Sequence, residues 1–462
     1  MGVYTTTNPA TGEVLATYPE IVDGQIDALI ECAASAQVEW AATPAPERAA
    51  VLHRAAEIHR ERLDDLAALL TREMGKPIAQ ARAEVKLVAS IYEYYADHLA
   101  EFLADQPLPI SGDGSAVVRS EPIGALLGVM PWNFPYYQVA RFAAPNLALG
   151  NTVIIKHARN CPQSAMAIEE VLREAGAPDG VYTNAFISSA QVEQVIADDR
   201  IAGVSLTGSE RAGEAIGAAA GRYLKRSVLE LGGSDPFIVL GDADVEQAAT
   251  VAAAGRLYNA GQACTASKRF IVHEKVYDEF LTHFATAMKS YTPADPTRED
   301  TTMGPLSSAD AARELDEYVQ DAVTRGARVV VGGREEGAEG AFYPPTVLVD
   351  VPEEAGAYRD ELFGPVAVVH PVADEDAAVR LANDSPYGLA GTVFSGDRDR
   401  ARAVADRLQT GMVAINSLIR SAPDLPFGGV KRSGVGRELA RDGFVAFANQ
   451  KLVRDPAAEG EA

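Results

Sequence analysis

The spacing of apolar and polar positions predicts helices first and then alternating strands and helices. In the first hundred residues, small apolar residues recur among charged ones at helical spacing, which predicts amphipathic helices over residues 23–40, 46–74 and 78–102. From residue 116 to 129 the chain changes to residues that favour strands. We expect the early helices to cover one face of a sheet.

Further along the chain, short apolar runs alternate with helical stretches. The first series comprises residues 152–156, 164–175, 185–187, 191–197, 204–207 and 210–223, and the second comprises 236–240, 245–258, 269–272 and 275–290. This alternation is typical of βαβ units on a parallel sheet. It predicts an α/β protein with two parallel-sheet domains. Gly232-Gly233 lies between the two series, as a hinge or as a turn with unusual dihedral angles.

Composition excludes several classes of protein. The 462 residues are 47% hydrophobic, enough for two or three domains with substantial cores. A net charge of −24 without basic runs argues against nucleic-acid binding. No apolar run is long enough for a membrane span and the N-terminus does not resemble a signal peptide, so we expect a cytoplasmic protein. The three cysteines are too few for a disulfide framework, and no Cys or His spacing predicts a metal site.

One cysteine and one glutamate suggest a chemistry. Cys264 follows Gly261-Gln262-Ala263, and Glu230 lies about thirty residues upstream, before Leu231-Gly232-Gly233. A thiolate can add to an aldehyde, and a carboxylate can activate the water that hydrolyses the resulting thioester. A lone cysteine is more often a small buried apolar residue, so the neighbouring residues decide the interpretation.

These neighbourhoods resemble the aldehyde dehydrogenase superfamily over nearly the whole chain. The matching segments, in the family's order, are 131–135 (Pro-Trp-Asn-Phe-Pro), 155–156 (Ile-Lys), 207–209 (Thr-Gly-Ser) followed by Gly213, 229–236, 261–264, 361–365 (Glu-Leu-Phe-Gly-Pro) and 426–429 (Pro-Phe-Gly-Gly). Seven motifs in order are specific evidence, although each alone is weak. The resemblance implies the aldehyde dehydrogenase fold with two Rossmann-like domains, and oxidation of an aldehyde with a nicotinamide cofactor.

The resemblance also implies a cofactor site. Residues 204–209 read as a strand that enters a helix, where a helix N-terminus can approach phosphate oxygens, although the glycine pair alone is more often a helix-packing feature. By similarity, the cofactor contacts are Trp132, Lys156, Gly208, Ser209, Gly213, Glu361 and Phe363.

Arg159 bears on the choice of cofactor. Family members that select NAD commonly carry an acidic residue here, whereas an arginine would attract a 2′-phosphate. We therefore expect NADP to be favoured over NAD. In the alternative, Arg159 extends into solvent and both cofactors are used.

The motifs assign the chemical steps by resemblance. Cys264 would be the nucleophile, and Asn133 and the backbone N–H of Cys264 would stabilise the oxyanion. Glu230 would activate water, which points to a free carboxylic acid product; its alternative role is a structural salt bridge.

The substrate is indicated by two further residues. Arg141 lies among apolar residues, where an arginine needs an anion, either a substrate carboxylate or an internal Asp or Glu. The short semialdehyde dehydrogenases that act on succinate semialdehyde look similar here, and Ser421 matches their second carboxylate contact. Asp424 departs from their pattern, which has an arginine. A neutral aliphatic or betaine aldehyde is the alternative substrate, and a non-catalytic protein on the same fold is the rival from another class.

The resemblance divides the chain as follows. We expect a cofactor-binding domain at residues 1–103 and 123–230, a catalytic domain at 231–422, an oligomerisation arm at 104–122 and 443–462, and a return to the cofactor-binding domain at 423–442. The arm implies a homodimer or homotetramer, whereas an ordinary hairpin and a C-terminal strand are the alternative.

Overall fold

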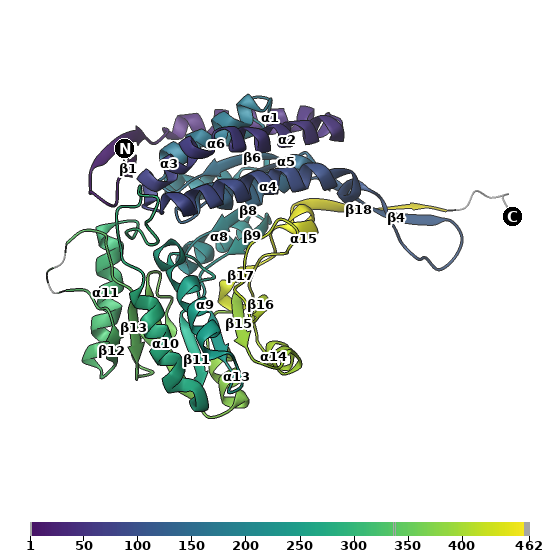
Figure 1. The fold of residues 1–462 in the computed structure, drawn as a ribbon. Helices are drawn as coiled ribbons and strands as arrows, with labels where there is room; N and C mark the ends of the chain where they lie inside the picture. The colour runs from purple at the N-terminus through teal and green to yellow at the C-terminus, as the bar shows by residue number, and fades with distance from the viewer. Residues whose placement is uncertain (1, 336, 338, 457–462) are drawn as a thin grey trace.

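Two large sheets, each covered by helices on both faces, form the body of the protein (Figure 1). The computed structural model describes residues 2–335, 337 and 339–456. A narrow arm of strands extends from the body (Figure 1). The α/β fold expected from the alternating pattern is confirmed.

The first sheet has six strands in the order β17-β9-β8-β5-β6-β7. Its strands are β5 (Ala125–Val129), β6 (Thr152–Lys156), β7 (Tyr182–Asn184), β8 (Ile201–Thr207), β9 (Arg226–Glu230) and β17 (Gly434–Val435). All neighbours are parallel except β17, which is antiparallel to β9. The helices around it are α1 (Ile26–Ala42), α2 (Ala45–Glu61), α3 (Leu63–Met74), α4 (Ile78–Leu103), α5 (Pro135–Leu149), α6 (Pro162–Glu174), α7 (Ser189–Ala197) and α8 (Glu210–Arg222).

The second sheet has seven strands in the order β12-β13-β14-β11-β10-β15-β16. Its strands are β10 (Pro236–Val239), β11 (Arg269–His273), β12 (Arg328–Val331), β13 (Thr346–Val349), β14 (Val366–Val372), β15 (Ala390–Phe394) and β16 (Met412–Ile415). Only β12 is antiparallel to its neighbour. Its helices are α9 (Val245–Leu257), α10 (Tyr277–Lys289), α11 (Ala309–Thr324), α12 (Gly356–Arg359), α13 (Glu375–Asn383) and α14 (Arg398–Ala405).

The arm is a separate three-stranded sheet. It consists of β3 (Gln106–Pro107), β4 (Ser115–Pro122) and β18 (Ala448–Asp455), in the order β18-β4-β3. Helix α15 (Ala440–Val445) leads into β18, and a short hairpin of β1 (Val3–Thr7) and β2 (Val14–Pro19) lies near the N-terminus. Every residue of β18 after Ala448 is exposed, so its outer edge is open to another chain.

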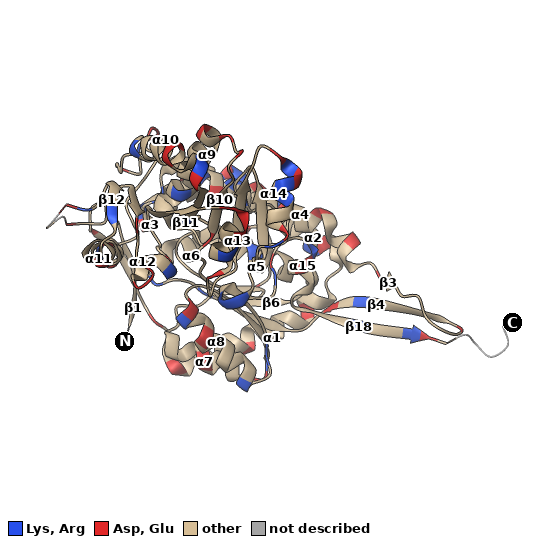
Figure 2. Cartoon of the chain, turned by 90° about the horizontal axis from the view of Figure 1, so that it is seen from below, with Lys and Arg blue, Asp and Glu red and all other residues tan. Residues whose placement is uncertain are grey.

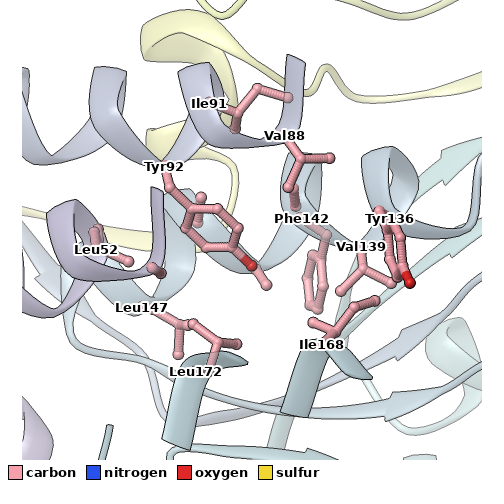
Figure 3. Packing of buried hydrophobic residues seen from close by; sticks show 14 of the residues in the cluster. Leu52, Val88, Ile91, Tyr92, Tyr136, Val139, Phe142, Leu147, Ile168 and Leu172 are labelled. Atoms are coloured by element: carbon pink, nitrogen blue, oxygen red, sulfur yellow. The ribbon is translucent and has the colours of Figure 1, made fainter. Parts of the chain in front are cut away.

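Helix α5 lies at the centre of the largest hydrophobic core. All fifteen of its residues are buried, because α4 packs on one side and the first sheet on the other. Tyr92 and Val88 of α4 point toward Phe142 and Val139 of α5 (Figure 3). A helix buried on every side loses the amphipathic pattern, and its one arginine must therefore find an internal partner.

The structure refines several expected elements. The helix expected over residues 46–74 is two helices that meet at Arg62, and the strand expected at 185–187 lies at Tyr182–Asn184. The segments expected to form an oligomerisation arm, 104–122 and 443–462, contain the three strands of the arm, although residues 457–462 lie outside the described residues. The proposed domain boundaries stay a prediction.

In the view of Figure 2, acidic and basic residues are interspersed along the chain. Many exposed arginines pair with carboxylates, as Arg54 does with Glu57 and Glu61. Among the described residues, no helix is long and apolar enough to cross a membrane.

Candidate active site

Cys264 lies on a loop with an unusual backbone. The preceding turn, Tyr258–Gly261, contains Asn259 and Ala260 with φ of 52° and 53°, values that residues with a side chain rarely adopt. Gly261 has φ of 76°, and a Cβ there would lie 2.4 Å from the carbonyl oxygen of Gly364. Only glycine allows this contact, which joins the cysteine motif to the motif at 361–365.

Two buried cations hold this loop in place. Nη2 of Arg256 donates to the carbonyl oxygens of Gly261 at 2.6 Å and Gly364 at 2.5 Å. Nζ of Lys268 donates to the carbonyl oxygen of Cys264 at 2.8 Å and forms an ion pair with Glu361 at 3.3 Å. The backbone at Cys264 is therefore fixed on both sides.

The half-buried Cys264 lines a cavity of about 470 Å³. The other lining residues are mostly apolar or aromatic, including Phe134, Tyr137, Tyr258 and Leu418. Burial raises the pKa of the Cys264 thiol to about 12, while nearby Arg141 and Lys268 act in the opposite direction. The thiol of this structure is thus largely protonated at neutral pH.

We expect alkylation of Cys264 by iodoacetamide to accelerate steadily with pH. Only the thiolate reacts, and below a pKa of about 12 its fraction grows about tenfold for each pH unit. The rate of inactivation of the cofactor-free enzyme should therefore rise about 100-fold from pH 7 to pH 9. A C32S background removes the exposed Cys32 thiol from the measurement. A rate that levels off near pH 8 would mean that the neighbouring cations lower the pKa more than burial raises it.

Glu230 ends strand β9 in a buried position. It pairs in register with Thr207 at the end of β8, and its side chain is 2% exposed. Neither carboxylate oxygen has a hydrogen-bond partner among the described residues. A Cβ on Gly428 would lie 2.5 Å from Oε1 of Glu230, so the glycine of the 426–429 motif makes room for this carboxylate.

Burial raises the pKa of Glu230 well above its usual value. Arg141 lowers it, Glu438 raises it further and Arg437 lowers it. A carboxylate held without hydrogen-bond donors and with a raised pKa is a stronger base than an exposed glutamate. Glu230 forms no salt bridge, its alternative role, with any of the residues that the structure describes.

Asn133 precedes helix α5, with its side chain buried. Its Nδ2 donates to the carbonyl oxygen of Gln262 at 3.1 Å, so the amide lies against the cysteine loop. The backbone carbonyl oxygen of Asn133 accepts hydrogen bonds from Nζ of Lys76 at 2.9 Å and from Nδ2 of Asn259 at 3.0 Å. One N–H of the amide remains available to an oxyanion beside Cys264.

Lys76 and Glu84 form a buried ion pair that sequence reasoning missed. Oε1 of Glu84 accepts from the backbone N–H groups of Tyr136 at 3.0 Å and Tyr137 at 3.1 Å, at the start of α5. The pair therefore fixes both the carbonyl of Asn133 and the helix behind it. The only signal in the sequence was a charge at an inward-facing position of α4.

Arg141 has an internal anion. It is fully buried, its Nε forms an ion pair with Glu438, and its Nη2 donates to Oγ1 of Thr207 at 3.1 Å. Arg141 is not among the residues that line the cavity, and it reaches the cavity through Tyr137, whose hydroxyl accepts from Nη1 at 3.3 Å. The structure thus shows that Arg141 pairs with an internal carboxylate, Glu438, which is the alternative to a substrate carboxylate. Direct contact of Arg141 with a substrate carboxylate stays a prediction that this geometry does not favour.

Ser421 lines the same cavity as Cys264. Its Oγ accepts a hydrogen bond from the hydroxyl of Tyr137 at 2.8 Å. The expected substrate contact of Ser421 is therefore sterically available, and it is connected to Arg141 by one tyrosine.

The residues expected to bind the cofactor lie around the C-terminal edge of the first sheet. Helix α8 starts at Glu210 after Gly208 and Ser209, and a Cβ on Gly208 would meet only a side-chain carbon of Leu206 at 3.8 Å. The space in front of Gly208 is thus open to a phosphate. Beside α8, Gly213 and Leu231 line a groove of about 310 Å³.

Lys156 and Arg159 follow the neighbouring strand. Burial lowers the pKa of Lys156 to about 8, with Arg159 acting in the same direction. No described residue accepts a hydrogen bond from Nζ of Lys156, which leaves it free for a ribose hydroxyl. Arg159 is exposed and forms an ion pair with Glu20. Its guanidinium can leave Glu20 for a phosphate, so its expected role stays a prediction.

Trp132 follows β5, whereas Glu361 and Phe363 lie between α12 and β14 of the second sheet. The rings of Trp132 and Phe363 meet edge to face with centroids 5.7 Å apart, and Oε1 of Glu361 accepts from the N–H of Gly233 at 3.1 Å. The cofactor contacts of these residues, and of Gly208 and Lys156, stay predictions. Among the described residues, no group of three or more His, Cys, Asp or Glu side chains could hold a metal ion.

Comparison with known proteins identifies the family. Residues 2–453 match the model of the aldehyde dehydrogenase family. The succinate-semialdehyde dehydrogenase [NADP(+)] of Deinococcus radiodurans is 54% identical, over 98% of this chain and 94% of that protein. Succinate-semialdehyde dehydrogenase [NADP(+)] 1 of Mycobacterium ulcerans is 44% identical, over 97% of this chain and 98% of its own. The crystal structure of succinic semialdehyde dehydrogenase from Streptococcus pyogenes in complex with NADP+ superimposes with a TM-score of 0.96, at 45% identity, over 98% of this chain and 100% of that chain. The chain belongs to the aldehyde dehydrogenase family.

Proposed function

We propose that this protein oxidises succinate semialdehyde to succinate, with NADP as the hydride acceptor. The observation that carries the proposal is the 54% identity, over 98% of this chain, to a protein named succinate-semialdehyde dehydrogenase [NADP(+)]. Three observations support it: Cys264 lines a cavity, the carboxylate oxygens of Glu230 have no hydrogen-bond partner among the described residues, and the side-chain amide of Asn133 lies against the cysteine loop.

In the proposed first step, the thiolate of Cys264 attacks the aldehyde carbonyl carbon and forms a carbon–sulfur bond. The carbonyl π electrons move to oxygen, and the oxyanion is stabilised by Nδ2–H of Asn133 and the backbone N–H of Cys264. NADP, which Lys156, Glu361 and Phe363 would hold, would supply the hydride acceptor for oxidation of this carbon. The oxyanion then re-forms the C=O bond, which leaves a thioester on Cys264.

In the second step, Glu230 removes a proton from a water molecule that attacks the thioester carbonyl. The C–S bond breaks, the electron pair returns to Cys264 as thiolate, and the carboxylic acid leaves. The lack of any hydrogen-bond partner for Glu230 among the described residues leaves both oxygens available to water. A carboxylate here favours transfer to water over transfer to another nucleophile.

Preference for NADP rests on Arg159. Its exposed guanidinium lies after β6 and carries the positive charge that a 2′-phosphate would attract. Glu20 competes for the same guanidinium, so we expect a preference for NADP over NAD rather than complete rejection of NAD.

We also propose that the protein forms a homodimer or homotetramer in the cytoplasm. The open edge of β18 in the arm can pair with another copy of the chain. A reducing compartment suits the three free cysteines, among them the proposed nucleophile.

Initial rates over a grid of substrates test the proposed function. Succinate semialdehyde, glutarate semialdehyde, butanal and betaine aldehyde are each assayed with NADP and with NAD. We expect kcat/KM to be highest for succinate semialdehyde with NADP. Higher values for butanal or betaine aldehyde would favour a neutral substrate instead, in keeping with the mostly apolar cavity wall.

A further inference from the structure

Lys268 is a buried cation that lies outside the motifs of the sequence but contacts three of them. Its side chain is 1% exposed, and it is not among the described residues that line the cavity beside Cys264. Its Nζ donates to the carbonyl oxygens of Ala263 at 3.3 Å and Cys264 at 2.8 Å, and its backbone N–H donates to the carbonyl oxygen of Asp235 at 3.1 Å. A buried ammonium group is stable only where its charge and its donors are matched, so these contacts indicate what Lys268 does.

Glu361 is the anion that matches this charge. Nζ of Lys268 lies 3.3 Å from Oε1 of Glu361, and the same oxygen accepts from the N–H of Gly233 at 3.1 Å. No described residue donates a hydrogen bond to Oε2. A Cβ on Gly232 would overlap with Oε2, so this glycine leaves the space that the oxygen occupies. The carboxylate is therefore held through one oxygen, and the other is left for a ligand.

The hydrogen bond to Ala263 bears on the oxyanion site. The carbonyl oxygen of Ala263 and the N–H of Cys264 belong to one planar, conjugated peptide unit. A cation bonded to that oxygen draws electron density from the nitrogen and makes the N–H a stronger donor. Because this N–H is one of the two donors expected to stabilise the oxyanion, Lys268 both fixes its direction and strengthens it.

The charge of Lys268 also acts on the thiol. Burial raises the pKa of Cys264 to about 12, while Arg141 and then Lys268 lower it. Burial lowers the pKa of Lys268 itself, whereas Glu361 and Asp235 raise it and favour the charged form. The positive charge beside the nucleophile therefore depends on Glu361, the residue expected to contact the cofactor.

We propose that Lys268 is a positioning residue that couples the cofactor site to the nucleophile: it holds Glu361 for the cofactor, and it orients and polarises the peptide N–H at Cys264. The inference rests on the proposed function, because it assumes the chemistry of Cys264 and a nicotinamide cofactor, but it does not depend on which aldehyde is oxidised. One ammonium group makes both contacts, so removing it should change two separate measurements.

The first test replaces Lys268 with methionine, which removes the charge and the donors but keeps most of the volume. Cofactor-free hydrolysis of p-nitrophenyl acetate depends on Cys264 and the oxyanion donors. Its kcat/KM should fall about 10- to 100-fold in K268M, less than the roughly 10²- to 10³-fold that complete loss of an oxyanion donor costs. The Kd for NADP, followed by protein fluorescence, should rise about 10-fold, because Glu361 loses its partner. K275M, a matched change at an exposed lysine, should keep both wild-type values.

A double-mutant cycle tests the route through Glu361. If Lys268 reaches the cofactor only by holding this carboxylate, K268M/E361Q should bind NADP as weakly as E361Q alone. A general loosening of the fold would instead add to the effect of E361Q. Additive losses in Kd would therefore overturn the coupling.

The remaining outcomes also decide the proposal. A folded K268M with ester hydrolysis and Kd for NADP both within about twofold of the wild type would overturn it. If K268M does not fold, as judged by thermal melting, K268Q is measured in its place, and failure of both to fold would show that Lys268 serves the fold rather than the reaction. A wild type that prefers butanal to succinate semialdehyde would refute the proposed substrate alone, because neither measurement on Lys268 uses an aldehyde.

Discussion

Replacing Cys264 with serine is expected to lower kcat for aldehyde oxidation by about 10⁴-fold or more. The serine hydroxyl is a weaker nucleophile than a thiolate, and no described residue is placed to deprotonate it at hydrogen-bond distance. Without the covalent adduct, no tetrahedral carbon forms from which a hydride can leave. The rate of NADPH formation measures the loss.

The other two cysteines provide matched controls for this change. Cys32 is exposed and Cys161 is buried away from the cavity, so C32S and C161S should retain activity close to that of the wild type. Binding of NADP to C264S, followed by the change in protein fluorescence, should also be retained. A C264S enzyme within about tenfold of the wild type would show that the thiol is not the nucleophile.

Much of the fold follows from local sequence patterns. Buried parallel strands such as Thr152–Lys156 appear as short apolar runs, and the helices between them carry apolar residues on the faces that meet the sheet. The division of residues 46–74 into two helices at Arg62 has no such signal, because neither glycine nor proline marks the break. Local propensity did not determine that boundary; the packing of α2 and α3 on α6 did.

The site was only partly predictable for a different reason. Cys264, Glu230 and Asn133 were found because they lie in motifs, whereas the residues that orient them are far apart in the chain. Glu438, the partner of Arg141, lies near the C-terminus, and no pattern connects the two before the chain folds. Arg159 and Glu20 illustrate the same limit.

The glycines of the motifs have roles that the structure explains. Gly261 allows the cysteine loop to contact Gly364, and Gly428 leaves space for the carboxylate of Glu230. Each glycine therefore joins one motif to another at a distance that a Cβ would prevent. The motifs look separate in sequence, but these two glycines bring residues of different motifs into close contact.

Replacing Glu230 with glutamine should separate the two chemical steps. The amide has nearly the same shape as the carboxylate but cannot accept the proton of water. Hydride transfer should proceed once for each active site, and turnover should then slow by about 10²- to 10⁴-fold, the usual contribution of a general base. Stopped-flow absorbance should show a burst of NADPH equal to the enzyme concentration, and intact-protein mass spectrometry should show the acyl group on Cys264.

The pH dependence of the wild type should agree with this role. The carboxylate is the active form, and burial raises its pKa, so hydrolysis of the thioester should be lost as the pH falls through that raised pKa. The decline should begin at a higher pH than an exposed glutamate would give. In E230Q the rate of the slow phase should no longer decline at low pH, because no titrating base remains.

Two comparisons make the Glu230 prediction decisive. E193Q, a matched change at an exposed glutamate paired with Arg222, should behave as the wild type. Hydroxylamine attacks thioesters without a general base, so it should restore turnover in E230Q but not in C264S. A slow first turnover without a burst would instead place Glu230 before the thioester, as the base that deprotonates Cys264. Burial raises the pKa of both Glu230 and Cys264, so either group could need the other as a base or an acid. If Glu230 activates water, E230Q stops after the burst; if Glu230 deprotonates Cys264, E230Q stops before it. The burst amplitude therefore distinguishes the two roles.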